Sequence, residues 1–226
     1  MGERVEFTTG DGTGVGYLAL PPAGRGPGLI VIQEWWGLVP HIEDVCDRFA
    51  AEGYVALAPD LYHGETAGDR AEADRKMQEL GVTEAADELI GAIDHLLGLD
   101  AVSSQQVGLV GFCLGGALAL VAAHVAPDRV AVAVPFYGVF WYGDPDLSQI
   151  RCPVLMQIGS QDDVVTVERI EELAERVRQA GAPVSVVVQD DAGHAFFNDS
   201  LPDRHRPEAA ARAWHDTIEF LRDHLG

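Results

Sequence analysis

Short runs of apolar residues alternate along the chain with longer segments in which apolar positions recur every three or four residues. The uninterrupted runs are typical of strands that are covered on both faces of a sheet. They fall at residues 28–32, 54–60, 108–112, 130–134, 154–158 and 184–188. The helical periodicity falls between and after them, at residues 42–53, 83–98, 114–125, 170–181 and 207–225.

This alternation of strand and helix predicts a mostly parallel central sheet with right-handed crossovers and helices on both faces. Residues 5–7 and 15–20 predict a starting hairpin that turns at Gly10-Asp11-Gly12. Residues 64–82 are polar and predict a loop and a surface helix over a cleft. No linker or internal repeat interrupts the pattern, so we expect one α/β domain over residues 1–226.

The charge of the chain limits the kinds of partner that it can bind. The net charge is −21, with 36 acidic against 15 basic residues, which disfavours nucleic acid and anionic membranes as partners.

Three widely spaced cysteines, with no metal-type spacing, suit free thiols in a reducing compartment. The apolar stretch 107–126 has three glycines at the predicted elbow and is better explained by a buried strand and helix than by a membrane span. The first residues have no apolar signal region. We therefore expect a cytoplasmic protein.

The strongest chemical signal is the segment GFCLG at residues 111–115. It has the G-x-S-x-G pattern of a nucleophile elbow with Cys113 in place of serine. Glycine two residues before and after the nucleophile removes a collision on the tight strand-to-helix turn. The turn also places Cys113 at a helix N-terminus, where the helix dipole favours a thiolate.

Two further strand ends carry polar groups that would meet Cys113 at the carboxyl edge of a parallel sheet. Asp162 and Asp163 follow the strand at 154–158, and His194 follows the strand at 184–188. Nucleophile, acid and histidine in this chain order are typical of an α/β-hydrolase triad. We favour Asp162 as the acid because it comes first after the turn; Asp163 is the alternative.

The chemistry suggests a role for each group. His194 would act as general base toward the thiol, and Asp162 would orient the imidazole. Backbone N–H groups of Leu114 and Trp35 are placed to form an oxyanion hole. Glu34 follows the strand at 28–32, close to Cys113. We hypothesise that its carboxylate hydrogen-bonds the thiol and holds it protonated until substrate displaces it.

Several motifs taken together resemble the dienelactone hydrolase family. They are Gln33-Glu34 before an aromatic loop, GFCLGG at 111–116, GSQD at 159–162 and AGHAF at 192–196. DLY at 60–62 and FYGV at 136–139 fit the same family. The resemblance implies an α/β-hydrolase fold, a Cys-His-Asp triad, no cofactor, and hydrolysis of an enol lactone or related ester.

The substrate pocket departs from that family. Family enzymes hold a substrate carboxylate with arginines, and one of these positions is Asn198 here, four residues after His194. Arg70 is the best match to the second arginine, with Arg75 in reserve, and Asp74 stands near the place of a family tyrosine. Among the aromatic residues of the expected cleft, we predict that Trp36, Tyr137 and Phe196 contact substrate.

The sequence therefore predicts a carboxylic ester or lactone hydrolase that passes through an acyl-thioester on a small molecule. We expect no metal and a monomer or weak homo-oligomer. A class I glutaminase also uses a cysteine elbow, but there a glutamate closely follows the histidine, and Ala195 to Asn198 follow here. A different alternative is an inactive hydrolase-fold protein that binds a ligand or senses oxidants through Cys113.

Overall fold

One mixed sheet organises the part of the chain that the computed structural model describes, residues 2–10, 12–141 and 143–225. Within these residues the sheet has eight strands in the order β1-β2-β4-β3-β5-β6-β7-β8, and every neighbouring pair from β4 to β8 is parallel. The strands are β1 (Glu3–Thr8), β2 (Thr13–Ala19), β3 (Gly28–Ile32), β4 (Val55–Pro59), β5 (Val107–Phe112), β6 (Val130–Phe136), β7 (Val154–Gly159) and β8 (Val184–Gln189). The predicted mostly parallel sheet is confirmed.

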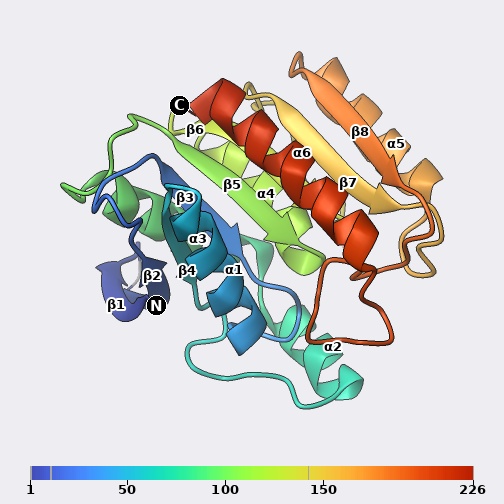
Figure 1. Ribbon diagram of the computed structural model, residues 1–226, viewed down its shortest axis with the longest axis horizontal. Helices are drawn as coiled ribbons and strands as arrows, with labels where there is room; N and C mark the ends of the chain where they lie inside the picture. The colour runs from blue at the N-terminus through green and yellow to red at the C-terminus, as the bar shows by residue number, and fades with distance from the viewer. Residues whose placement is uncertain (1, 11, 142, 226) are drawn as a thin grey trace.

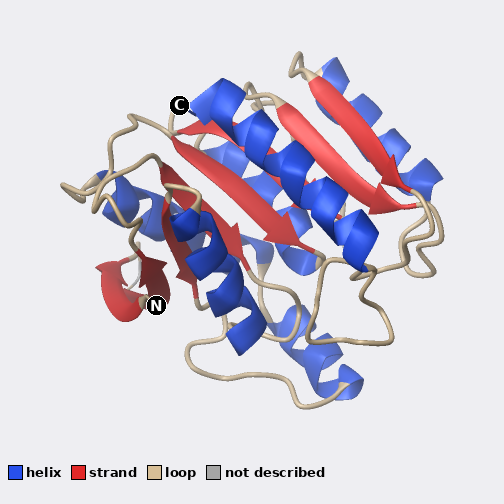
Figure 2. Ribbon diagram, viewed as in Figure 1, coloured by secondary structure: helices blue, strands red, loops and turns tan. Residues whose placement is uncertain are grey.

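Helices cover both faces of this sheet. They are α1 (Pro40–Ala51), α2 (Arg70–Glu79), α3 (Val82–Leu97), α4 (Leu114–Val125), α5 (Val167–Gln179) and α6 (Pro207–Leu225). Figure 1 shows α1 and α6 on the face nearer the viewer and α4 and α5 on the other. The same layering is clear when the helices and strands are coloured by type in Figure 2. Each predicted helix and strand is present, with bounds that differ by a few residues.

The predicted hairpin is also present. Strands β1 and β2 pair antiparallel from Glu3 opposite Leu18 to Thr8 opposite Thr13. Strand β2 then pairs antiparallel with β4, so the hairpin forms one end of the sheet. One residue of the predicted hairpin turn, Asp11, lies outside the described residues.

The stretch 107–126 forms β5 and α4, as the sequence analysis favoured. Every residue of α4 from Leu114 to Ala123 is buried, because the helix lies between the sheet and α3. This double coverage explains why α4 consists of apolar and small residues without a polar face. No helix within the described residues is long and apolar enough to cross a membrane.

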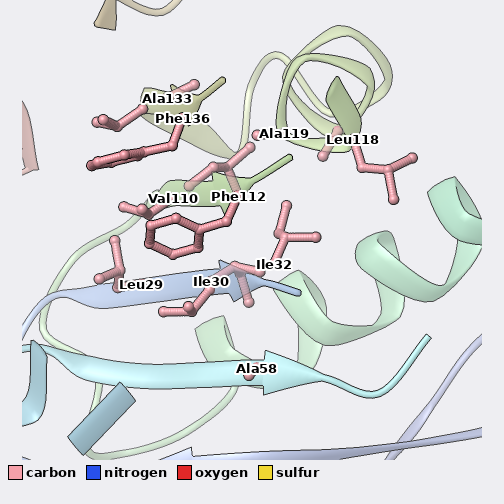
Figure 3. Close-up of a cluster of buried hydrophobic side chains, with 14 of the residues drawn as sticks. Leu29, Ile30, Ile32, Ala58, Val110, Phe112, Leu118, Ala119, Ala133 and Phe136 are labelled. Atoms are coloured by element: carbon pink, nitrogen blue, oxygen red, sulfur yellow. The ribbon is translucent and has the colours of Figure 1, made fainter. Parts of the chain in front are cut away.

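The core beneath the carboxyl edge of the sheet is aromatic. Figure 3 shows Phe112 and Phe136 among the aliphatic side chains of β3 and β5. Their ring centroids are 4.8 Å apart, and Phe197 stacks on Phe112 at 5.2 Å. All three are fully buried. The strand ends that carry the site therefore rest on a packed layer, in which aromatic pairs add stability beyond their buried area.

Helix α2 lies beyond the carboxyl ends of the parallel strands (Figure 1). Asp69 caps its first turn by accepting a hydrogen bond from the N–H of Glu72 at 2.9 Å. The helix is mostly polar, as predicted, but Lys76 is only 6% exposed. Its ammonium pairs with Glu65 and lies 5.7 Å from the centre of the Tyr62 ring. These contacts hold α2 against the loop that follows β4.

Candidate active site

Cys113 occupies a strained turn between β5 and α4. Its backbone has φ 53° and ψ −111°, a conformation that costs free energy for any residue with a side chain. The turn is compact as well: a Cβ at Gly111 would lie 2.0 Å from the carbonyl oxygen of Gly115, and a Cβ at Gly115 would lie 2.3 Å from that of Ile32. Glycine is therefore required at both flanking positions, as the elbow pattern predicts.

Three strand ends bring Cys113, His194 and Asp162 into contact. The Sγ of Cys113 lies 3.3 Å from Nε2 of His194, and Nδ1 of His194 lies 2.9 Å from Oδ2 of Asp162. These residues follow β5, β8 and β7, whose carboxyl ends share one edge of the sheet. The arrangement can move a proton from the thiol to the imidazole while the carboxylate orients the ring.

The two candidate acids have different surroundings. The side chain of Asp162 is fully buried, and its Oδ1 accepts hydrogen bonds from the N–H groups of Val164 and Val165 at 2.8 and 2.7 Å. Asp163 instead forms an ion pair with Arg204 and its side chain is 63% exposed. The structure therefore brings Asp162, and not Asp163, to His194.

Hydrogen bonding favours the protonated form of the His194 imidazole. Burial disfavours the cation, but the hydrogen bonds to Asp162 and Cys113 outweigh burial and raise the pKa of His194 to about 10. A proton on Nε2 points toward Sγ of Cys113, and a proton on Nδ1 points toward Asp162. The site can thus keep a donor beside the sulfur at neutral pH.

Glu34 is buried beside this triad in the wall of a shared cavity, and two side chains hold it. Its Oε2 accepts a hydrogen bond from Nδ2 of Asn198 at 2.6 Å, and its Oε1 accepts one from the hydroxyl of Tyr137 at 3.4 Å. Burial raises the pKa of Glu34 above its usual value, although His41 and Asn198 act in the opposite direction.

The hypothesised hydrogen bond between Glu34 and the thiol is not formed. Among the described residues, the side-chain partner of Cys113 is His194, and the partners of Glu34 are Asn198 and Tyr137. Asn198 lies four residues after His194 and donates its amide hydrogen bond to the carboxylate of Glu34. The two groups still line the same cavity.

That cavity has a volume of about 270 Å³ and opens beside Cys113 and His194. Side chains from the loop after β3, from α2, and from the loops after β6, β7 and β8 form its wall. They are Glu34, Trp35, Trp36, Arg70, Asp74, Met77, Cys113, Trp141, Val164, His194, Ala195, Leu201 and Arg204. Most of the wall is apolar or aromatic, which suits a small organic ligand with few polar groups.

The predicted substrate contacts divide into two groups. Trp36 and Arg70 line the cavity. Tyr137 and Phe196 do not: both are fully buried, their rings are 5.5 Å apart, and Tyr137 packs against the ring of His194 at 5.0 Å. The prediction that these two residues contact substrate is therefore corrected. They support His194 and Glu34 from behind.

The cavity wall contains an arginine besides Arg70 that the sequence analysis did not predict. Arg204 lies ten residues after His194 and reaches the wall through the loop 199–206. The reserve candidate Arg75 is paired with Glu72 and Glu79 on the outer side of α2 and does not line the cavity. The one relevant signal in the sequence was Asn198 at a position where the family resemblance led us to expect an arginine. That signal did not indicate which other residue would bring a positive charge to the cavity.

The two predicted oxyanion-hole donors, Leu114 and Trp35, lie on the turns after β5 and β3. Leu114 is the first residue of α4, so its N–H has no partner within the helix. Trp35 lies on the turn after β3 and lines the same cavity. Both N–H groups are also absent from the backbone hydrogen bonds of the described turns and loops. No cluster of His, Cys, Asp or Glu side chains within the described residues is arranged to hold a metal ion.

An eight-stranded sheet of this order, with a nucleophile elbow after β5 and a histidine after β8, defines an α/β-hydrolase. Comparison of the sequence with known families gives the narrower assignment. The profile of the dienelactone hydrolase family matches residues 15–225. The chain belongs to this family and is a hydrolase.

Individual relatives agree with this assignment. The chain is 36% identical to Protein usf of Aquifex pyrophilus and 32% identical to a provisionally named carboxymethylenebutenolidase of Aquifex aeolicus, and each alignment covers both proteins fully. Among solved structures, a provisionally named dienelactone hydrolase from Klebsiella pneumoniae aligns with a TM-score of 0.87 and 24% identity. That alignment covers 99% of this chain and all of the other, and it supports the fold.

Proposed function

We propose that the protein hydrolyses small carboxylic esters or lactones through a Cys113–His194–Asp162 triad and an acyl-thioester intermediate. The observation that carries the proposal is the contact of 3.3 Å between Sγ of Cys113 and Nε2 of His194 at the edge of an apolar cavity. A thiolate beside a protonated imidazole is the reactive state of a thiol nucleophile.

The proposed reaction has two halves. In the first, the thiol of Cys113 gives its proton to His194 and the sulfur attacks the carbonyl carbon, while the N–H groups of Leu114 and Trp35 stabilise the oxyanion. Collapse of this intermediate breaks the ester bond, and His194 gives its proton to the leaving oxygen. In the second, His194 takes a proton from water, hydroxide attacks the thioester, and the carboxylic acid leaves while the sulfur regains its proton from His194.

The cavity supports a small and partly unsaturated substrate. Trp35, Trp36 and Trp141 supply flat apolar surfaces, and Arg70 and Arg204 supply positive charge at the wall. The relative from Aquifex aeolicus carries the name of a lactone hydrolase. Asn198 replaces a family arginine, however, and is engaged with Glu34. We therefore propose an ester or lactone substrate without assigning dienelactone itself.

We also propose a positioning role for Glu34. Its buried carboxyl is shared between Asn198 and Tyr137, and Tyr137 packs against the imidazole of His194. The network therefore links the loop after β3, the loop after β6 and the loop after β8. It holds the ring of His194 at the distance from Cys113 that proton transfer requires.

Rapid-mixing kinetics with p-nitrophenyl acetate test the proposal. We expect a burst of nitrophenol equal to the enzyme concentration, and intact-protein mass spectrometry should show one acetyl group added to the chain. Cys113→Ser should abolish the burst, and Cys113→Ala should abolish both signals. Hydrolysis that survives in Cys113→Ala would overturn the proposal. Reversible oxidation of Cys113 without esterase activity would favour the oxidant-sensing alternative.

A further inference from the structure

A second cavity lies directly beside the candidate active site. It has a volume of about 420 Å³, and it is bordered by the end of α2, the start of α3, the first turns of α4 and the loop after β6. Its wall consists of Met77, Gln78, Leu80, Gly81, Val82, Leu114, Ala117, Leu118, Val139, Phe140 and Trp141. We call it the side cavity. Met77 and Trp141 border both cavities, so the two cavities adjoin at these side chains.

The chemistry of the side cavity differs from that of the catalytic cavity. None of its described wall residues carries a charge, and polar side-chain atoms come only from Gln78 and Trp141. The amide of Gln78 is already hydrogen-bonded to Asp74 at 2.7 Å. The catalytic cavity, in contrast, has Arg70, Asp74 and Arg204 in its wall. A hydrocarbon chain is the ligand that an uncharged wall of this kind favours.

The side cavity is open to solvent at apolar residues. Val82 is 43% exposed and Trp141 is 36% exposed, and they stand among the few large hydrophobic residues that the described surface leaves uncovered. A ligand that covered them would remove apolar surface from water, which is favourable in proportion to the area buried. A ligand in the side cavity would therefore explain why apolar side chains are exposed at its mouth.

The position of the oxyanion donor indicates which part of a substrate enters the side cavity. Leu114 offers its N–H to the carbonyl oxygen in the proposed reaction, and its side chain lines the side cavity. His194 protonates the leaving oxygen and lines only the catalytic cavity. The leaving alcohol must therefore lie on the side of His194. The acyl group then extends on the side of Leu114.

We propose that the side cavity is an acyl-chain site, so that the enzyme prefers esters of medium-length aliphatic acids over acetate esters. This inference rests on the proposed function and names its substrate class. The acyl group would be attached to Cys113 as a thioester, while its methylenes lie between Leu114, Val82 and Trp141. The released product is a medium-chain carboxylic acid.

The wild-type test is a series of p-nitrophenyl esters from acetyl to octanoyl. Complete burial of one methylene corresponds to about fourfold in kcat/KM, and partial burial to less. We expect kcat/KM to rise by at least about tenfold from acetyl to hexanoyl. A flat or falling series, together with a normal burst on the acetyl ester, would overturn the acyl-chain site and leave the proposed function intact. Loss of the acetyl burst would instead contradict the proposed function.

Variants at the mouth of the side cavity give a second test. Val82→Trp narrows the mouth and Val82→Asp places a charge there, and the exposed position at the start of α3 tolerates both. In each variant the ratio of hexanoyl to acetyl kcat/KM should fall by about tenfold. Val188→Trp on β8 is the matched control, because Val188 is 40% exposed and borders neither cavity. An equal ratio in the Val82 variants and the control would overturn the proposal.

Discussion

Asn198 donates a hydrogen bond of 2.6 Å to Glu34, and both side chains are buried. The two residues are far apart in the chain, one after β3 and the other after β8, and Glu34 lines the same cavity as Cys113 and His194. Asn198 is a neutral partner, so the buried carboxyl of Glu34 has no full positive charge at hydrogen-bond distance on that side.

The first prediction concerns the pH dependence of stability. Burial raises the pKa of Glu34 in the folded protein, so the folded state binds more protons than the unfolded state once the pH exceeds about 4.5. The contribution of Glu34 to stability is therefore largest at acid pH and falls as the pH rises toward the folded-state pKa. Glu34→Gln retains acceptor and donor groups but does not titrate.

We expect the stability of Glu34→Gln relative to wild type to increase between about pH 4 and about pH 7. Urea unfolding of both proteins across this range measures the difference in the free energy of unfolding. Stability curves that run parallel would contradict a raised pKa at Glu34.

The second prediction concerns the strained turn. The φ of 53° at Cys113 suits glycine and disfavours a side chain. Cys113→Gly and Cys113→Ala should both be inactive, but the glycine variant should be more stable by about 1 kcal/mol, because it relieves the strain. Thermal unfolding of the two variants gives the comparison. An alanine variant that is equal or superior in stability would mean that the turn carries no strain.

The third prediction separates the two acids after β7. Asp162→Asn removes the charge that orients His194 and should lower kcat by about 10²- to 10⁴-fold without unfolding the protein. Asp163→Asn breaks only an exposed ion pair with Arg204 and should change kcat by less than about threefold. Steady-state kinetics with p-nitrophenyl acetate measure kcat for both variants. Similar losses in both variants would remove Asp162 from the proposed triad.

The fourth prediction concerns the charge at the cavity wall. Arg70 lines the cavity from the first turn of α2, so Arg70→Gln should raise KM for an anionic ester by about three- to tenfold and leave the KM of a neutral ester unchanged. The effect should shrink at high salt. Arg75→Gln is the matched control, since Arg75 lies on the same helix outside the cavity. Equal effects from both variants would exclude a specific contact by Arg70.

The strand and helix positions were predictable because buried strands and amphipathic helices leave different periodicities in the sequence. The meeting of Cys113, His194 and Asp162 was predictable as well, because parallel strands deliver their carboxyl ends to one edge. Both inferences depend on backbone topology. Neither inference requires knowledge of the rotamers of individual side chains.

The contacts that sequence reasoning missed depend on side-chain direction. Whether Glu34 faces the thiol or Asn198 is decided by the rotamers of two side chains on separate loops, and no periodicity records that choice. The same is true of Tyr137, whose φ of 40° turns it into the interior behind His194. Arg204 reaches the cavity wall from the loop 199–206, and its guanidinium also pairs with Asp163.

The close contact of α4 with β3 at Gly115 has an evolutionary consequence. Since any side chain at this position would strike the carbonyl oxygen of Ile32, the sulfur-bearing turn has almost no room to shift. New substrate preferences must then arise elsewhere: from α2, from the start of α3, or from the loop 199–206, which border the cavities without supporting the turn. The turn that carries Cys113 is therefore fixed, whereas the residues that line the cavities can change in sequence without moving it.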